Sequence, residues 1–180
     1  MNGATGSPKR SFSYEELPYE LTFPAMWRHV ATREGDRELM VSLTADGDVE
    51  RITYRDADVA SAQLARRLVA SGVGAGTRVG ILAPNGVDFV VAFIATCRIG
   101  AVAVPINTFF QSRELGWVLR DADIHTLLTV PTLLGQNVLD RVEGAVEGLA
   151  GADGSRPLLL PSTPALRQVM SLGQAERAWL

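Results

Sequence analysis

The sequence predicts an α/β fold, with a mostly parallel sheet flanked by helices and a β-hairpin near the N-terminus. The main observation is the stretch 87–106, which is apolar at nearly every position. Gly100 and Pro105 interrupt it, so we expect a buried helix over 87–99 and a buried strand over 101–104. A helix that leads into a wholly apolar strand is half of a parallel α/β repeat.

Two further observations predict the same class. The segments 78–83 and 124–130 are rich in apolar residues and have the length of buried strands. An Asp46-Gly47 pair lies between the apolar runs 39–43 and 49–53, which is a strong short-range signal for a hairpin.

A membrane span is the alternative for the apolar stretch. A transmembrane helix needs about 20 apolar residues with few or no charges. Asp88 and Arg98 leave only 89–97 uncharged, so we expect burial in a protein core.

Composition limits the class of protein. The chain has 180 residues, of which 47% are hydrophobic and 21% charged, as in ordinary globular domains. A net charge of −3 gives no electrostatic reason to expect nucleic acid as a partner. A single cysteine excludes an intramolecular disulfide and a multi-cysteine metal site. Because residues 1–20 are polar and lack the apolar segment of a secretory signal, we expect a cytoplasmic protein, with a flexible lead-in over 1–21 and one domain over 22–180.

The first helix is expected to begin at Thr22 or Phe23, with Pro24 in its first turn. Four residues share one face at helical spacing, and we interpret them as core rather than as the wall of a ligand site: Met26, Trp27, Val30 and Ala31.

The second helix should follow the hairpin directly. Thr53 and Asp56 have the spacing of a capping box, and Gly72 is suited to the C-terminal end. Arg66 and Arg67 fall on the opposite side from the apolar positions, so a solvated face is favoured over a phosphate site. The inner face is formed by Ala57, Ala60, Leu64 and Leu68.

The glycine-rich segment 72–76 is not a dinucleotide-binding loop. Such a loop follows a strand and opens a helix, so that helix N–H groups meet the phosphate. This segment follows a helix, opens a strand and is one residue short of the required spacing.

Two helices and a short strand are expected after residue 111, in addition to the strand over 124–130. Ser112 begins a helix that ends near 121–123, with Leu115, Val118 and Leu119 inward. A further amphipathic helix follows Pro131, a surface loop covers 151–155, and 166–172 forms a short strand. The inner face of that amphipathic helix is marked by Val138, Val142, Val146 and Leu149.

Ligands of parallel α/β sheets bind at the carboxyl ends of strands, which here means the loops 84–86 and 105–108. Neither loop carries a general base, a metal cluster or a glycine cradle. His29, His125 and Cys97 are the remaining reactive side chains, and each is interpreted as structural; a buried thiol has a raised pKa and is a poor nucleophile. The sequence therefore assigns no catalytic, cofactor-binding or metal-binding residue.

The order of motifs resembles adenylate-forming (AMP-binding) enzymes, and the acyl-CoA ligases most closely. The similar segments run from Thr22 to Val130, and 131–172 is compatible with the same pattern. They are Ile52-Thr-Tyr-Arg-Asp-Ala-Asp, Gly72-Val-Gly-Ala-Gly-Thr-Arg-Val-Gly-Ile-Leu, Pro84-Asn-Gly-Val-Asp-Phe and Cys97-Arg-Ile-Gly-Ala-Val-Ala-Val-Pro-Ile-Asn107.

The resemblance implies that a complete enzyme activates an acid with ATP and magnesium, then passes the acyl group to coenzyme A. It also implies a phosphate loop rich in Ser, Thr and Gly, and a late catalytic lysine. Neither is found here, since the only lysine is Lys9 and no such loop occurs. The chain resembles the first subdomain of that family's large domain, so no cofactor is expected within it.

Two functions follow as hypotheses. The first is an N-terminal fragment, truncated or split, of an ATP-dependent acyl-CoA ligase, inactive alone and partnered by the missing C-terminal portion. The second is a non-catalytic α/β module that self-associates or pairs with another chain, because an isolated subdomain should leave an apolar face open.

Overall fold

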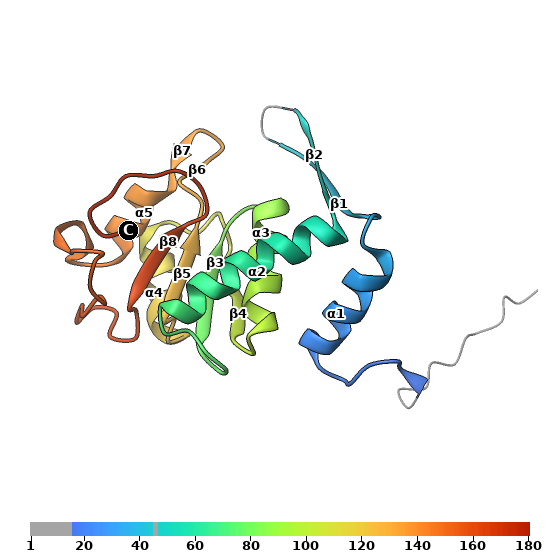
Figure 1. Ribbon diagram of the computed structural model, residues 1–180. Helices are drawn as coiled ribbons and strands as arrows, with labels where there is room; N and C mark the ends of the chain where they lie inside the picture. Colours follow the sequence, from blue (N-terminus) through green and yellow to red (C-terminus); the bar gives the residue numbers. More distant parts are fainter. Residues whose placement is uncertain (1–15, 45–46) are drawn as a thin grey trace, which may run out of the picture.

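A parallel sheet forms the centre of the molecule, and helices cover both of its faces (Figure 1). The computed structural model describes residues 16–44 and 47–180, so Asp46 and most of the expected lead-in lie outside it. The strand order is β4-β3-β5-β8, and every pair is parallel. The four strands are β3 (Arg78–Leu82), β4 (Val102–Pro105), β5 (Thr126–Thr129) and β8 (Gln168–Ser171).

The helices form two pairs. The crossover from β3 to β4 steps in one direction along the sheet, and the crossover from β4 to β5 steps back. Because such crossovers are right-handed, their two helices lie on opposite faces. One face carries α2 (Tyr54–Ala70) and α3 (Val87–Arg98); the other carries α4 (Ser112–Asp121) and α5 (Val138–Ala145). The helix expected over 87–99 is therefore confirmed.

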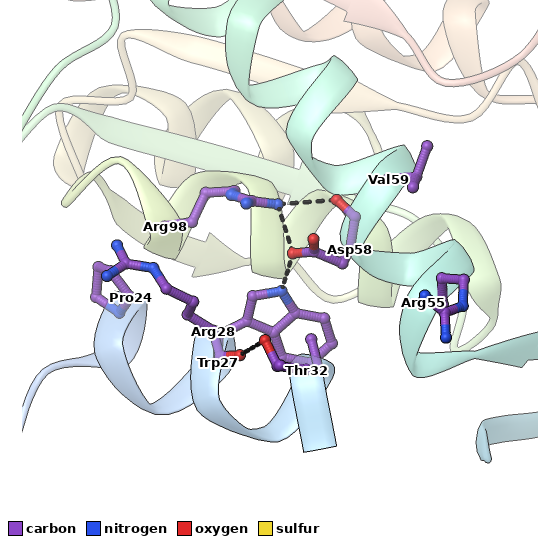
Figure 2. A pocket seen from close by; sticks show the side chains of 9 residues that line it. Pro24, Trp27, Arg28, Thr32, Arg55, Asp58, Val59 and Arg98 are labelled. Atoms are coloured by element: carbon purple, nitrogen blue, oxygen red, sulfur yellow. Dashed lines mark hydrogen bonds and ion pairs between the residues drawn. The ribbon is translucent and has the colours of Figure 1, made fainter. Parts of the chain in front are cut away.

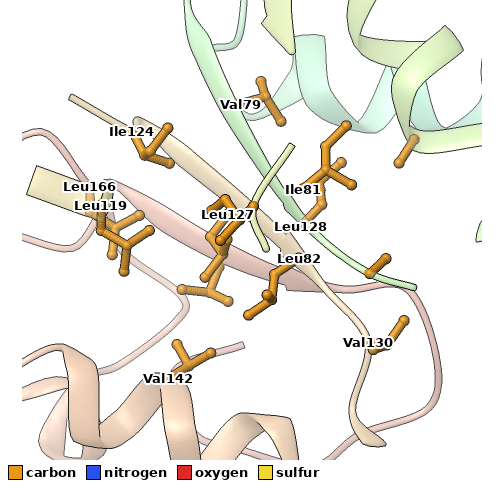
Figure 3. Close-up of a cluster of buried hydrophobic side chains, with 14 of the residues drawn as sticks. Val79, Ile81, Leu82, Leu119, Ile124, Leu127, Leu128, Val130, Val142 and Leu166 are labelled. Carbon is orange, nitrogen blue, oxygen red and sulfur yellow. The ribbon is translucent and has the colours of Figure 1, made fainter. Parts of the chain in front are cut away.

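The main core lies between the sheet and these helices. Strand β5 is completely buried, including Thr126 and Thr129. Figure 3 shows Leu127 and Leu128 of this strand among other buried aliphatic side chains of the core, including Ile81 and Leu166. No helix in the described part of the chain is long and apolar enough to cross a bilayer.

The N-terminal segment forms a second, smaller core. It contains α1 (Phe23–Glu34) and the antiparallel hairpin β1 (Glu38–Leu43) and β2 (Val49–Thr53). These elements lie at the opposite end of the molecule from β8 (Figure 1). The small core is formed by Trp27, Ile52, Ala57 and Ile94.

The predicted helix caps are confirmed, with one difference. Thr22 accepts a hydrogen bond from the Ala25 N–H, and Thr53 accepts one from the Asp56 N–H at 3.1 Å. The Asp56 carboxylate accepts from the Thr53 hydroxyl at 2.7 Å instead of reaching back to the backbone. Gly72, with φ +86, follows α2 and leads toward β3, which confirms that its glycine-rich segment is a turn.

The expectation that strand 101–104 is buried is wrong. Strand β4 is the edge of the sheet, and the Val102 side chain is 45% exposed. Its apolar sequence suits burial on both sides, but no described strand lies beyond it.

The expected helix over 138–149 is also shorter than its pattern. Helix α5 ends at Ala145, and Gly148 adopts a left-handed conformation before the short 3-10 helix η2 (Leu149–Gly151). Val146 and Leu149 are nevertheless buried, so the pattern identified core positions correctly but not the helix end. A small hairpin before α5, β6 (Thr132–Leu133) and β7 (Gln136–Asn137), was not anticipated.

Candidate functional site

The two loops expected to form a site do meet. They line a hollow of about 440 Å³ at the carboxyl ends of β3 and β4, which we call the strand-end hollow. Its walls are the segment 83–85, the segment 105–109, and Phe89 of α3. Leu133 and Leu134 of the small hairpin close it from the side of β5.

Local hydrogen bonds hold the second of these loops. The Ile106 N–H donates to the Ile81 carbonyl at 2.9 Å, which keeps the start of the loop beside β3. The Asn107 side-chain oxygen then accepts from the Phe109 N–H at 2.9 Å. Phe109, at this turn, is 79% exposed, and Leu134, which also lines the hollow, is 70% exposed.

Arg141 of α5 holds the loop 105–110 in place, although the sequence did not identify it as a site residue. Its guanidinium donates to the Thr108 carbonyl at 2.7 Å and to the Phe110 carbonyl at 3.3 Å. The residue is only 9% exposed, although it is charged. No spacing rule joins Arg141 to a loop more than 30 positions earlier, so only the fold identifies it as a positioning residue.

The chemistry of the strand-end hollow is apolar and neutral. Its polar side chains are Asn85, Asn107 and Thr108, and no titratable group lines it. Such a surface can contact an apolar group and hydrogen-bond to its ends, but it offers no acid, base or nucleophile. The residues therefore do not fit a magnesium–triphosphate group, and within the described residues no three His, Cys, Asp or Glu side chains gather as a metal site.

A second hollow, of about 570 Å³, lies between α1, α2 and the end of α3 (Figure 2). Asp58 occupies its centre: it accepts from the Trp27 indole N–H at 2.7 Å and pairs with Arg98 at 3.2 Å. Arg98 also donates to the Asp58 carbonyl and to the Ser61 hydroxyl, at 2.9 and 2.8 Å. Because these polar groups satisfy one another, the network docks α1 onto the body. Trp27 has the core role that the sequence predicts, while its edge lines this hollow.

The remaining reactive side chains lie apart from one another. The His29 ring lies 5.3 Å from the Tyr19 ring, at a tilt of 42°, near the N-terminal end of the described chain, whereas His125 precedes β5. Burial, and then the charge of Arg167, lower the pKa of His125. Burial raises the pKa of the Cys97 thiol, as expected for a residue of α3. No nucleophile, base and acid come together in these positions.

The AMP-binding enzyme family profile matches residues 27–172. Similar curated proteins include the acetyl-coenzyme A synthetase of Thiobacillus denitrificans, 30% identical over 143 residues, or 79% of this chain and 22% of that protein. The long-chain-fatty-acid–CoA ligase FadD13 of Mycobacterium tuberculosis is 39% identical over 72 residues, or 40% of this chain and 14% of that protein. This chain thus spans about a fifth of the length of the curated relatives it matches.

Solved structures show the same fold. The N-terminal domain of FACL13 from Mycobacterium tuberculosis, crystallised with an inhibitor, superposes with a TM-score of 0.63 at 26% identity, covering 83% of this chain and 33% of that one. The anthranilate CoA ligase AuaEII, in complex with anthranoyl-AMP, has a TM-score of 0.67 at 21% identity, covering 92% of this chain and 27% of that one.

Proposed function

The chain belongs to the AMP-binding enzyme family, and from this premise we propose that it is the first structural part of an acyl-CoA ligase. The complete enzyme would activate a carboxylic acid with ATP and transfer the acyl group to coenzyme A. The part described here would scaffold that enzyme and supply one wall of a binding site. It would be inactive alone.

The observation that carries the proposal is the open edge at β4. A wholly apolar strand in a parallel sheet is typical of burial on both faces, and an edge strand with unpaired backbone groups is usually charged or covered by another element. Strand β4 has one described neighbour, β3, yet every residue from Ala101 to Ile106 is apolar. A sheet that ends on such a strand beside the strand-end hollow fits a domain whose remaining elements come from further chain.

The backbone of β4 shows how a partner could pair with it. The Val102 and Ile106 N–H groups donate to Thr77 and Ile81, on the side of β3. Positions between them alternate in direction, so Ala103 and Pro105 turn their backbone groups outward. Proline lacks an N–H group, which leaves Ala103 as the outward donor and limits pairing to a short segment.

The residues of the strand-end hollow could position a ligand, but they offer no group that could take part in the reaction. The strand-end hollow holds no cation that could oppose a triphosphate and no group that could transfer a proton. ATP, magnesium and coenzyme A would therefore be held by residues of the complete enzyme outside this part. The neutral walls of the hollow suit an apolar portion of the acid or of the acyl acceptor.

Acid-dependent exchange between ATP and radiolabelled pyrophosphate tests the proposal. We expect no exchange above background by the purified 180-residue chain with fatty or aromatic acids, beside a full-length acyl-CoA ligase as positive control. Exchange by the chain alone would overturn the proposal. The nucleotide sequence downstream gives a second test: a reading frame with a Ser/Thr/Gly-rich loop and a lysine supports it, and unrelated sequence contradicts it.

The alternative is a non-catalytic module that uses the same open edge to bind a second copy of itself. The exposed Val102 at that edge is the observation in its favour. Persistent self-association, with no ligase sequence downstream, would support this alternative over the first proposal.

A further inference from the structure

Three arginines from distant parts of the sequence line one hollow at the β8 end of the sheet. Arg67 lies in the last turn of α2, Arg156 in the loop that precedes β8, and Arg167 directly before that strand. The hollow measures about 380 Å³, and a second hollow of about 410 Å³ shares Arg156 and Arg167 with it. We propose that this arginine cleft binds a small phosphate-bearing anion of the size of a diphosphate.

The charge of the arginine cleft argues for an anion. No Asp or Glu side chain lines either hollow, although the chain as a whole carries a net charge of −3. Leu180 also lines the first hollow and carries the α-carboxylate of the 180-residue chain, so three guanidinium groups face one negative group there. Asp153 is the nearest acid in sequence to Arg156, and its carboxylate is bonded to the N–H and hydroxyl of Ser155 at 2.9 and 2.8 Å. The positive charge is therefore a local accumulation and not a consequence of overall composition.

The three arginines differ in the interactions that their side chains make within the protein. Arg167 donates to the Pro164 carbonyl at 2.6 Å, which fixes the side chain, and Arg67 suits the negative end of the α2 dipole. Within the described residues, Arg156 has neither a side-chain hydrogen bond nor an ion pair. Guanidinium groups bind phosphate oxygens with two parallel hydrogen bonds, so three of them match a ligand with two phosphate groups.

The wall of the cleft formed by Gly154, Trp179 and Leu180 is closely packed. A side chain at Gly154 would meet the backbone of Trp179 and Leu180 at 2.6 Å, so the C-terminal segment lies directly against the loop. Trp179 is 2% exposed, and its indole N–H donates to Glu143 at 2.8 Å. The cleft is thus built from segments that are fixed on the body of the domain.

His125 provides an internal probe of the cleft. Its carbonyl accepts from the Arg167 N–H at 2.8 Å, so the two residues are neighbours across the end of the sheet. Burial lowers the pKa of His125, and the positive charge of Arg167 lowers it further. An anion bound to Arg167 would reduce that second effect and raise the pKa of His125.

Titration calorimetry of the 180-residue chain with pyrophosphate at 150 mM salt tests the proposal. We expect saturable binding that weakens roughly tenfold or more in Arg156→Ala and in Arg67→Ala, because each loses a charge-assisted contact. Arg66→Ala is the matched control, since Arg66 neighbours Arg67 on α2 but does not line the cleft. The circular dichroism spectra of the three variants should match that of the parent chain, because Arg66, Arg67 and Arg156 are all exposed.

Two further measurements distinguish a built site from general attraction. NMR titration should show the pKa of His125 rise at saturating pyrophosphate, with His29 as the reference. A nucleoside diphosphate in a parallel titration shows whether the ligand carries a base: tighter binding indicates a nucleotide, equal binding phosphate alone. No saturable binding, equal loss in Arg66→Ala, or an unmoved His125 pKa would each overturn the proposal. None of these measurements rests on the proposed ligase function.

Discussion

At the scale of single residues, the Asp58 carboxylate of α2 links two other helices. It joins α1, through the Trp27 indole, to the end of α3, through Arg98. A hydrogen bond to a charged group contributes about 1.5–3 kcal/mol to stability, compared with about 1 kcal/mol for a neutral one. Docking of α1 should therefore depend on this carboxylate as well as on apolar contact.

Trp27→Phe tests that dependence. The change keeps an aromatic ring in the small core but removes the N–H that donates to Asp58. We expect a loss of about 1–2 kcal/mol in the free energy of unfolding, measured by urea denaturation. Trp117→Phe is the control, because Trp117 is 55% exposed, and it should cost no more than about 0.5 kcal/mol. Equal losses in the two variants would contradict the role assigned to the indole.

Residue roles were predictable where the partner is near in sequence. Thr22 and Thr53 were identified as caps because a cap and its helix are only three positions apart. Arg141 and Arg156 were not identified, since their roles depend on segments brought together by the fold. Arg67 was assigned to a solvated face for the same reason: its exposure is correct, but its neighbours across the cleft are invisible in the sequence.

At the scale of elements, close contact between α4 and α5 depends on glycine. A side chain at Gly116, in the middle of α4, would lie 2.7 Å from the Ala145 carbonyl oxygen at the end of α5. At Gly144 of α5, it would lie 2.7 Å from the Ser112 hydroxyl oxygen. The two helices thus approach each other through one glycine on each side.

Gly116→Ala should separate these helices. Alanine favours a helix over glycine by about 1 kcal/mol, but overpacking against a backbone atom costs about 1–3 kcal/mol. We expect a net loss of stability of about 1 kcal/mol, measured by urea denaturation. Gly151→Ala is the control, because nothing lies within 4 Å of a side chain there. If Gly116→Ala were more stable than the parent chain, α5 would have to move away from the new methyl group without a loss of packing energy, which would contradict the prediction.

The sequence predicted where most elements lie but not which strand ends the sheet. Apolar content is the same for a central strand and for an edge strand whose cover comes from elsewhere, so β4 was expected to be buried. Pro105 carried the missing signal, because proline within a sheet is found at edges and strand ends. The end of α5 was misjudged because Val146 and Leu149 keep the apolar spacing after Gly148 has broken the helix.

At the scale of the whole molecule, both hydrophobic cores are buried, but the sheet ends at β4 with an edge that no described strand covers. The order of motifs predicted the family and the α/β architecture, since those depend on the sequence of elements. It did not predict that exposed apolar residues line the strand-end hollow, because Phe109 and Leu134 come to the same hollow only in the fold. An open strand of this kind is a site of edge-to-edge pairing unless a charge protects it.

We therefore expect the isolated chain to self-associate through β4. Light scattering coupled to size exclusion should give a mass above the 19.3 kDa of one chain, and the excess should rise with concentration. Val102→Lys should restore the mass of a monomer, because a lysine on an edge strand opposes pairing. The side chain is already 45% exposed, so the substitution should not unfold the domain.

Val69→Lys supplies the matched control. Val69 is 55% exposed on α2, away from the edge, and the variant gains the same charge. If both variants became monomeric, net charge rather than the strand would govern association. A parent chain that stays monomeric at high concentration would show that Pro105 and the shortness of β4 protect the edge without a partner. That result would weaken the case that further chain must cover β4, because the edge would then be stable in water.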